Sequence, residues 1–380
     1  MKHYRVLVIG PRRALLEVLR ARGIAFAVWR EKAVFPIDDA EPLVTAPLWN
    51  TTAKLKQLIS ENFSAGHFTH VIAGGESSVY PAAVARRILG ARLAPASTAL
   101  RCRDKLAMKE YLSGHAIPMT DFLAESTTPS PAEAFARLGT PLVRKHRKSS
   151  GGRGFEIIHR EQDLALRRDG RNILERFVAA PEASIESFVN GGRIHFVNTT
   201  RYLEKGLVNF VPAALDEAVL ESIQALNQRV IEALKIDWGI THLEVYLTDG
   251  GPLFGEIALR PPGGYIMNAM QHAYVFNPWA AMVAMELGED FEFPAGVAAY
   301  VGAEVLHPGS GQVREVRGEA QVRAHAAVRE FRVKVKAGDV IGQRESVGQD
   351  VGHLLYACAT PAERDKVYRE FRKIFGIEVG

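Results

Sequence analysis

The stretch THLEVYLTDGGPLFGEIALRPPGGYI, residues 241–266, constrains the fold more than any other part of the sequence. Two apolar runs flank the turn-forming residues Asp-Gly-Gly-Pro at 249–252, and this pattern predicts an antiparallel hairpin. Each run holds one glutamate among apolar neighbours, Glu244 and Glu256, and the second run adds Arg260. Alternate residues of a strand share a face. We therefore expect Glu256 and Arg260 to point to the same side of the hairpin.

The register of this hairpin decides whether the two glutamates meet. With a three-residue loop at 249–251, Glu244 falls directly opposite Glu256, whereas a two-residue loop shifts the pairing by one. Like charges opposite each other destabilise a sheet by roughly 0.2–1 kcal/mol, and burial increases the penalty. A divalent ion such as Mg²⁺ would relieve it, because Mg²⁺ takes carboxylate ligands together with substrate phosphates. The alternative is a Glu256–Arg260 ion pair at the sheet edge, with Glu244 in solvent.

The N-terminal part of the chain alternates between apolar runs and amphipathic segments. Strands are expected at 4–10, 24–30 and 69–75, and helices at 11–23 and 78–90. This alternation predicts a parallel α/β domain over residues 1–98. The first turn, Ile-Gly-Pro-Arg-Arg-Ala, lacks G-x-G-x-x-G, so we do not expect a dinucleotide site there.

The remaining chain mixes helical and strand patterns. Residues 103–122 predict an amphipathic helix that breaks at Gly114 and resumes after Pro118. Residues 141–159 have the form of a strand, a polar glycine-rich loop and a second strand, and a long helix is expected at 216–236. From about residue 297, short strands, glycines and one final helix predict a small α+β module.

Composition narrows the class of protein. With 380 residues, 47% hydrophobic and 24% charged, the chain predicts a globular protein of two or three domains. No apolar run reaches membrane-spanning length, and the first residues resemble a core strand more than a secretory signal. The two cysteines are far apart, so a reducing cytoplasm is the expected compartment. The mild net charge of +4 argues against a nucleic-acid partner.

Two lysines and a glycine-rich loop could bind phosphates. Lys105 follows Asp104 at the start of a predicted helix, and Lys145 ends the strand before the loop Ser-Ser-Gly-Gly-Arg-Gly at 149–154. Backbone N–H groups and fixed cations of this kind can cover a triphosphate. The pattern is not a Walker loop, and a solvated hairpin tip is the alternative.

The order of the motifs is more specific than any one of them. The segments DKLAMKEYLSGHAIPMTDF, PLVRK…SSGGRG, ILERFV…PEASIESFV and HLEVYLTDGGPLFGEIALR follow each other along the chain. This arrangement resembles the ATP-grasp superfamily over about residues 70–290, and most closely its carboxylate–amine ligases of the L-amino-acid ligase type. The resemblance implies an α/β and α+β multidomain fold: a pre-ATP-grasp domain at 1–98, an ATP-grasp domain at 99–295 with a mobile lid at about 140–180, and a C-terminal module at 296–380.

The resemblance also implies roles for single residues. Residues expected to bind ATP are Lys105, Lys145, Ser149, Ser150, Gly151, Gly152, Arg153, Glu175, Phe177, Val178 and Glu182. Among them, the segment of Glu175, Phe177 and Val178 would bind adenine, and Glu182 the ribose hydroxyls. Glu244 and Glu256 would be the metal carboxylates. Arg260, Lys145, Gly263 and Gly264 would act in catalysis by steadying the transferred phosphoryl group and the acyl phosphate. Residues expected to contact substrate are Glu76, Arg201, Asn268 and His272.

The implied reaction is an ATP-dependent ligation. A carboxylate attacks the γ-phosphorus of ATP to give an acyl phosphate and ADP, and an amine then displaces phosphate. The implied cofactors are ATP and Mg²⁺, with Mn²⁺ as the alternative ion. The implied partners are small-molecule carboxylate and amine substrates, which we expect to be amino acids. No membrane partner is expected, and a homodimer is the oligomeric state considered.

One residue departs from the family pattern. Where the family often has Glu-x-Asn-x-Arg, this chain has Ala258, which cannot coordinate a metal. Two ions could still bind through a bridging Glu256, but the second metal site loses a ligand. An ATP-binding protein without ligase activity therefore stays open. Independently of Ala258, a carboxylase of the same fold that uses bicarbonate also stays open, although the first turn lacks the glycine-rich pattern usual in aminoimidazole ribonucleotide carboxylases.

Overall fold

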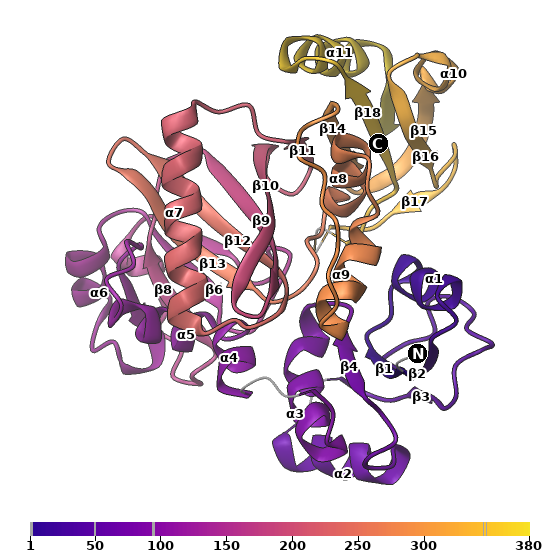
Figure 1. Cartoon of the computed structure of the whole chain (residues 1–380). Helices are drawn as coiled ribbons and strands as arrows, with labels where there is room; N and C mark the ends of the chain where they lie inside the picture. The colour runs from indigo at the N-terminus through magenta and orange to yellow at the C-terminus, as the bar shows by residue number, and fades with distance from the viewer. Residues whose placement is uncertain (1–2, 49–50, 93–95, 345, 347) are drawn as a thin grey trace.

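The computed structural model describes residues 3–48, 51–92, 96–344, 346 and 348–380 (Figure 1). Its N-terminal domain contains a four-stranded parallel sheet with the order β3-β2-β1-β4. Its elements are β1 (Arg5–Ile9), α1 (Arg13–Ala21), β2 (Ala25–Arg30), β3 (Leu43–Thr45), α2 (Thr52–Asn62), β4 (His70–Ala73) and α3 (Val79–Leu89). The predicted parallel α/β domain is confirmed. Because β2 and β4 flank β1, the strand order reverses beside β1, and this point is where parallel sheets usually bind ligands.

Two short helices lead to a small second sheet. They are α4 (Ala96–Arg101) and α5 (Lys105–Ser113), and the sheet has the order β5-β8-β6-β7. Its elements are β5 (Phe122–Ala124), α6 (Pro131–Leu138), β6 (Leu142–His146), β7 (Glu156–Ile158) and β8 (Asn172–Arg176). This subdomain contains the predicted lid and begins earlier than residue 140.

The expected return to helix after Pro118 is wrong. The chain there is extended: Met119 forms a bridge with Phe254, and β5 follows. A backbone at Ala116 with φ +53° and the fixed φ of proline lead the chain out of α5 and toward the lid.

One eight-stranded sheet connects the rest of the molecule. Its order is β13-β12-β9-β10-β11-β14-β18-β16. The strands are β9 (Glu182–Asn190), β10 (Arg193–Glu204), β11 (Val208–Val211), β12 (Gly239–Thr248), β13 (Gly251–Ala258), β14 (Tyr300–Leu306), β16 (Val328–Val333) and β18 (Gly352–Cys358). The last three belong to the predicted C-terminal module, which therefore extends the same sheet as the predicted ATP site.

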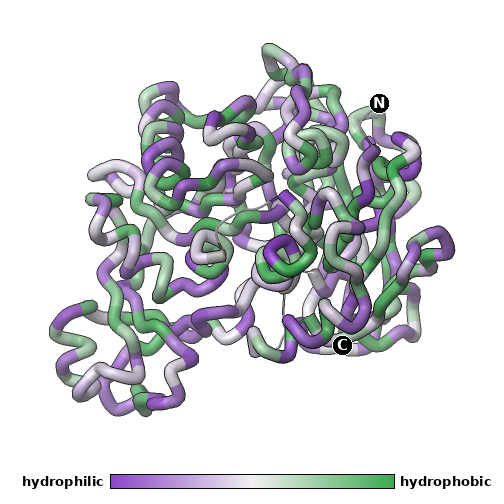
Figure 2. Tube along the Cα trace, turned by 60° about the horizontal axis from the view of Figure 1, so that its bottom comes forward, coloured by the Kyte–Doolittle hydropathy of each residue, from purple (hydrophilic) through white to green (hydrophobic). Residues whose placement is uncertain are grey.

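Helices cover both faces of this sheet. The long helix α7 (Glu217–Leu234) buries Ile223, Val230 and Leu234 against strands β9, β12 and β13. On the other face, α8 (Ile266–Tyr274) and α9 (Pro278–Leu287) share one apolar core with β1 and α1 of the N-terminal domain. Green and purple segments alternate along helical coils in Figure 2, as expected of helices with one buried face.

The C-terminal part adds a small sheet with the order β17-β15-β19 and two helices. The elements are β15 (Gly311–Arg317), α10 (Glu319–Ala324), β17 (Val340–Ile341), α11 (Pro361–Ile374) and β19 (Gly376–Val379). The mixed α/β and α+β fold is thus as predicted. Within the described part of the chain, no helix combines the length and the apolar character that crossing a membrane requires.

Candidate active site

Glu244 and Glu256 are directly opposite each other in the β12–β13 hairpin. The expected three-residue loop is wrong, because Thr248 pairs with Gly251 and leaves only Asp249 and Gly250 in the turn. The register then shifts between Glu244 and Val245, where Gly255 is the extra residue of a β-bulge. The bulge offsets the shorter turn, so the predicted pairing of the two carboxylates holds for a different reason. A Cβ at Gly255 would lie 3.0 Å from the Glu244 carbonyl oxygen, which explains the glycine.

Each of the two carboxylates contacts a lysine. Lys105 Nζ is 3.0 Å from Glu256 Oε2, and Lys205 Nζ is 3.1 Å from Glu244 Oε2. Lys205 also pairs with Glu182, the predicted ribose ligand at the start of β9. Burial would raise the pKa of Glu244, but Lys205 and His242 hold it well below its usual value. Lys205 and His242 thus keep Glu244 ionised, and Lys105 contacts Glu256 on the same face of the hairpin.

Helix α5 presents Lys105 at its first position. The Asp104 carboxylate caps the helix by accepting hydrogen bonds from the N–H groups of Leu106 and Ala107. The same carboxylate binds Arg147 at 2.8 and 2.9 Å, and thereby ties the helix start to the glycine-rich loop. Asp104 thus fixes both the lysine and the loop it meets.

Lys145 is bound to a buried carboxylate at the other side of the site. Its Nζ lies 3.0 Å from Glu175 Oε2, and Lys109 Nζ lies 3.2 Å from the same oxygen. Burial would raise the pKa of Glu175, but the two lysines lower it to about 2. The carboxylate of Glu175 therefore holds Lys145, while Phe177 and Val178 follow in the half-buried link between β8 and β9. Adenine binding by this segment stays a prediction.

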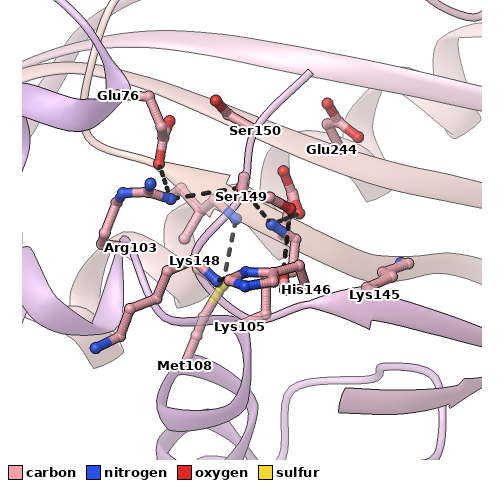
Figure 3. Close-up of polar contacts among 12 residues, drawn as sticks. Glu76, Arg103, Lys105, Met108, Lys145, His146, Lys148, Ser149, Ser150 and Glu244 are labelled. Carbon is pink, nitrogen blue, oxygen red and sulfur yellow. Dashed lines mark hydrogen bonds and ion pairs between the residues drawn. The ribbon is translucent and has the colours of Figure 1, made fainter. Parts of the chain in front are cut away.

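The glycine-rich loop forms the tip of the β6–β7 hairpin (Figure 3). The Ser149 carbonyl accepts hydrogen bonds from Lys105 Nζ at 2.9 Å and from Arg103 at 3.4 Å. Ser150 Oγ accepts one from Arg153. Gly151, Gly152 and Gly154 have φ values of +65°, +80° and +71°, which only glycine adopts readily. The backbone of this loop can therefore approach a ligand closely.

Arg260 is held by a residue of the N-terminal domain. Its Nε lies 2.7 Å from Glu76 Oε2, and Arg103 lies 3.3 Å from the other Glu76 oxygen (Figure 3 shows Glu76 and Arg103). Burial would raise the pKa of Glu76, but the two guanidinium groups lower it. Glu76 thus orients the predicted catalytic arginine, and its contact with substrate stays a prediction.

The glycines after Arg260 form a loop that a neighbouring strand holds. Asn209 Nδ2 in β11 donates to the Gly264 carbonyl at 2.8 Å. Gly264 has φ +61°, and a Cβ there would lie 2.7 Å from Asn209 Nδ2. A Cβ on Gly263 would meet no heavy atom within 4 Å, so the space beside this residue is open.

The remaining predicted substrate residues are placed apart from this centre. Asn268 and His272 on α8 both bind Glu330 of β16, His272 at 2.8 Å. Arg201 is half-buried in β10, and its charge adds to the desolvation that lowers the pKa of Arg364 in α11. Arg201, Asn268 and His272 therefore lie near the C-terminal part of the chain. The predicted site residues that the structure groups are Glu76, Lys105, Lys145, Glu244, Glu256 and Arg260.

Sequence reasoning missed several side chains of the site. Lys109 carried a usable signal, since it follows Lys105 by four positions and shares its helix face. Lys205, in the turn after β10, and Asn209 carried none. A buried network around Glu186 was missed as well: its carboxylate accepts hydrogen bonds from Asn198, Thr200, Ser184 and His242. Burial would lower the pKa of His242, but Glu186 and Glu244 raise it to about 9.

The donor set at the hairpin suits Mg²⁺ better than a transition metal. No group of three or more His, Cys, Asp and Glu side chains that could hold an ion occurs among the described residues. Glu244 and Glu256 supply two carboxylates, the number that Mg²⁺ usually takes alongside phosphates and water. Ala258 pairs with His242 and adds no ligand. The residues present therefore fit an ion that arrives with a nucleotide.

Comparison with known proteins identifies a domain of the chain. A model described as the ATP-grasp domain matches residues 110–272. The chain contains an ATP-grasp domain. A second model, described as L-amino acid ligase C-terminal domain 2, matches residues 304–379 of this ATP-grasp protein.

Relatives of this ATP-grasp protein agree with that assignment. An L-arginine-specific L-amino acid ligase of Bacillus subtilis is 27% identical, over 86% of this chain and 81% of its own length. A D-alanine–D-alanine ligase of Mycolicibacterium vanbaalenii is 26% identical over 42% of this chain and 50% of its own. The predicted ATP-dependent carboxylate–amine ligation is confirmed at the level of the reaction, and the ATP-grasp domain binds ATP.

Solved structures share the fold of the whole ATP-grasp chain. An L-amino acid ligase from Bacillus licheniformis has a TM-score of 0.83 at 20% identity and covers 100% of both chains. An N5-carboxyaminoimidazole ribonucleotide synthetase from Thermotoga maritima has a TM-score of 0.75 at 19% identity, with 99% of this chain and 100% of that chain covered. The fold alone therefore fits both the ligase and the carboxylase alternative.

Proposed function

We propose that this ATP-grasp ligase joins the carboxylate of one amino acid to the amine of another in an Mg²⁺-dependent reaction. The observation that carries the proposal is the pairing of Glu244 with Glu256 beside Lys105, in a chain whose C-terminal part matches the L-amino acid ligase model. The B. subtilis relative, named as an amino acid ligase, supports amino acids as substrates.

The residues would act mainly by positioning and by neutralising charge. Phosphoryl transfer needs little covalent help, so its barrier falls when cations surround the transferred group. Lys105 and Lys145 would bind the ATP phosphates, with the loop at 149–154 closing over them. Bound Mg²⁺ would supply charge neutralisation between Glu244, Glu256 and the phosphates.

Arg260 would steady the acyl phosphate once the first carboxylate has attacked the γ-phosphorus. The N–H groups of Gly263 and Gly264 would approach the acyl oxygen, where negative charge develops when the amine attacks. The amine nitrogen forms the new C–N bond and loses a proton, and phosphate leaves with the electrons of the C–O bond. Two buried free thiols, Cys102 and Cys358, are consistent with a reducing compartment.

The test is phosphate release from Mg-ATP with pairs of amino acids, with mass spectrometry of the product. Release that requires both an acid and an amine, and yields a dipeptide, is the expected result. Release that requires bicarbonate instead would favour the carboxylase alternative. ATP binding without release under any pair would favour a binding protein and would overturn the proposal.

A further inference from the structure

A cavity of about 680 Å³ opens between the N-terminal domain and the glycine-rich loop. One wall comes from residues that follow the carboxyl ends of β1, β2 and β4, including Gly10, Arg12 and Gly75. The opposite wall comes from the loop, including Ser149 and Arg153. The volume lies within the 300–1,000 Å³ of typical small-molecule sites. The cavity also reaches Glu76, the partner of Arg260, so it adjoins the reacting centre.

The lining of this cavity is strongly cationic. Six of its residues carry a positive charge: Arg12, Arg30, Lys32, Arg103, Lys148 and Arg153. Two carry a negative charge, Glu31 and Glu76. Glu76 is already bound by Arg260 and Arg103, so it leaves little negative charge for the other cations.

Four of the cations have no acidic partner in the described part of the chain. There, no carboxylate oxygen lies within 4 Å of the charged nitrogens of Arg12, Arg30, Lys32 or Arg153. Arg12 donates to the Gly74 carbonyl at 3.0 Å, and Arg30 to the Phe35 carbonyl at 3.1 Å. Desolvation and the nearby charge of Arg260 lower the pKa of Arg12. Uncompensated charges of one sign in a cleft attract a ligand of the opposite sign.

The backbone at this place favours an anion as well. Helix α1 begins at Arg13, and its N-cap residue Arg12 makes no side-chain capping bond, so the first N–H groups lack that partner. The positive end of the helix dipole adds to the arginine and lysine charges. The cavity also lies at the reversal of strand order beside β1, where parallel sheets bind ligands.

We propose that this cavity binds a substrate with an additional anionic group, a carboxylate or a phosphate monoester, held by Arg12, Arg30 and Lys32. The inference rests on the proposed ligase function and names its substrate class: an acidic or phosphorylated amino acid. The reacting end of that substrate would face Glu76 and Arg260. A substrate with a cationic side chain would meet like charges here, in contrast to the arginine named for the B. subtilis relative.

The first experiment measures binding and needs no turnover. The full-length protein with ADP is titrated calorimetrically with L-glutamate, O-phospho-L-serine, L-glutamine, L-serine and L-arginine. We expect at least tenfold tighter binding of L-glutamate than L-glutamine, or of O-phospho-L-serine than L-serine. Whichever pair shows the larger ratio identifies the anion as carboxylate or phosphate. Equal affinities within both pairs, or tighter binding of L-arginine, would overturn the proposal.

Substitutions of cavity residues test whether the selective binding of anions occurs in this cavity. Lys32→Gln and Arg30→Gln each remove one positive charge from the lining, and Lys56→Gln removes one from the exposed face of α2. We expect the first two to weaken binding of the preferred anion at least fivefold and to leave ADP affinity unchanged, whereas Lys56→Gln changes neither. Lys32 is exposed, so its variant tests the idea even if Arg30→Gln folds poorly.

The two proposals fail in different ways. Ligation of neutral amino acids with no preference for anionic ones would leave the ligase function standing and refute the anionic substrate. Selective anion binding that disappears in Lys32→Gln, without phosphate release for any amine, would support the cavity assignment and refute the proposed ligation.

Discussion

Glu244 and Glu256 pair across a hairpin whose two-residue turn would misalign them but for the bulge at Gly255. This pairing predicts that Glu244→Gln and Glu256→Gln each lower phosphate release at saturating Mg-ATP by at least about 100-fold, the scale of losing one charge-stabilising group. The exposed Glu221→Gln on α7 is the matched control and should keep normal activity. Activity near the normal level in either hairpin variant would show that the two carboxylates are not the metal ligands.

Glu76 Oε2 lies 2.7 Å from Arg260 Nε and orients the arginine. Substitutions of these two residues should therefore lower kcat by different amounts. Arg260→Ala removes the charge and is expected to lower kcat by about 100-fold or more. Glu76→Gln keeps the arginine but loosens its position, and we expect a loss of about tenfold in kcat. Steady-state kinetics with varied ATP check both. An unchanged kcat in Glu76→Gln would mean that Arg260 is held in place without it.

Lys109 shares the buried carboxylate of Glu175 with Lys145, and both Lys109 and Glu175 are almost inaccessible. Lys109→Met would leave the buried Glu175 carboxylate with Lys145 as its one remaining lysine partner. We expect the free energy of unfolding to fall by about 3 kcal/mol in urea titrations. The double variant Lys109→Met/Glu175→Gln should recover part of that loss. No recovery would mean that packing, not the ion pair, accounts for the effect.

The burial of Glu304 should make the free energy of unfolding depend on pH. Burial raises its pKa to about 7, above the unfolded value of about 4.3. Between these values the folded form holds a proton that the unfolded form has lost, so stability falls as pH rises from about 4.3 to 7 and stays lower above that. Glu304→Gln removes the titration. The free energy of unfolding of this variant, relative to that of the unmodified protein, should therefore rise by about 3 kcal/mol from pH 4.5 to pH 8. Urea unfolding at the two pH values measures this change. Parallel pH profiles for the two proteins would contradict the assignment.

The local sequence pattern was sufficient to predict much of the fold and the order of the site motifs along the chain. The parallel N-terminal sheet, α7 and the hairpin followed from apolar periodicity, because each element's own residues carry the signal. Pairing of Glu244 with Glu256 was predicted from an assumed loop of three residues. The bulge at Gly255 could not be foreseen, since it depends on how closely the partner strand approaches.

Contacts between segments that are far apart in the chain could not be predicted from the sequence. Lys205 reaches Glu182 and Glu244 from a turn that has no recognisable motif. The ion pair between Glu76 of the N-terminal domain and Arg260 was not foreseen either, and the substrate contact expected of Glu76 stays a prediction. The cationic cavity was missed for the same reason, because its charges come from turns of one domain and a loop of another. Mg²⁺ binding, the roles of single residues and a homodimer stay predictions.

The continuous sheet has a practical consequence for anyone building hybrids of this enzyme. Strand β11 pairs with β10 on one side and with β14 on the other, and the region matched by the C-terminal model begins inside β14. A fragment that stopped before β14 would leave the edge of β11 bare and prone to self-association. Exchange of C-terminal parts between relatives would therefore succeed only where the donor's β14, β16 and β18 complete the recipient's strand order. Junctions for such chimeras belong in connecting loops, away from the pairing of β11 with β14.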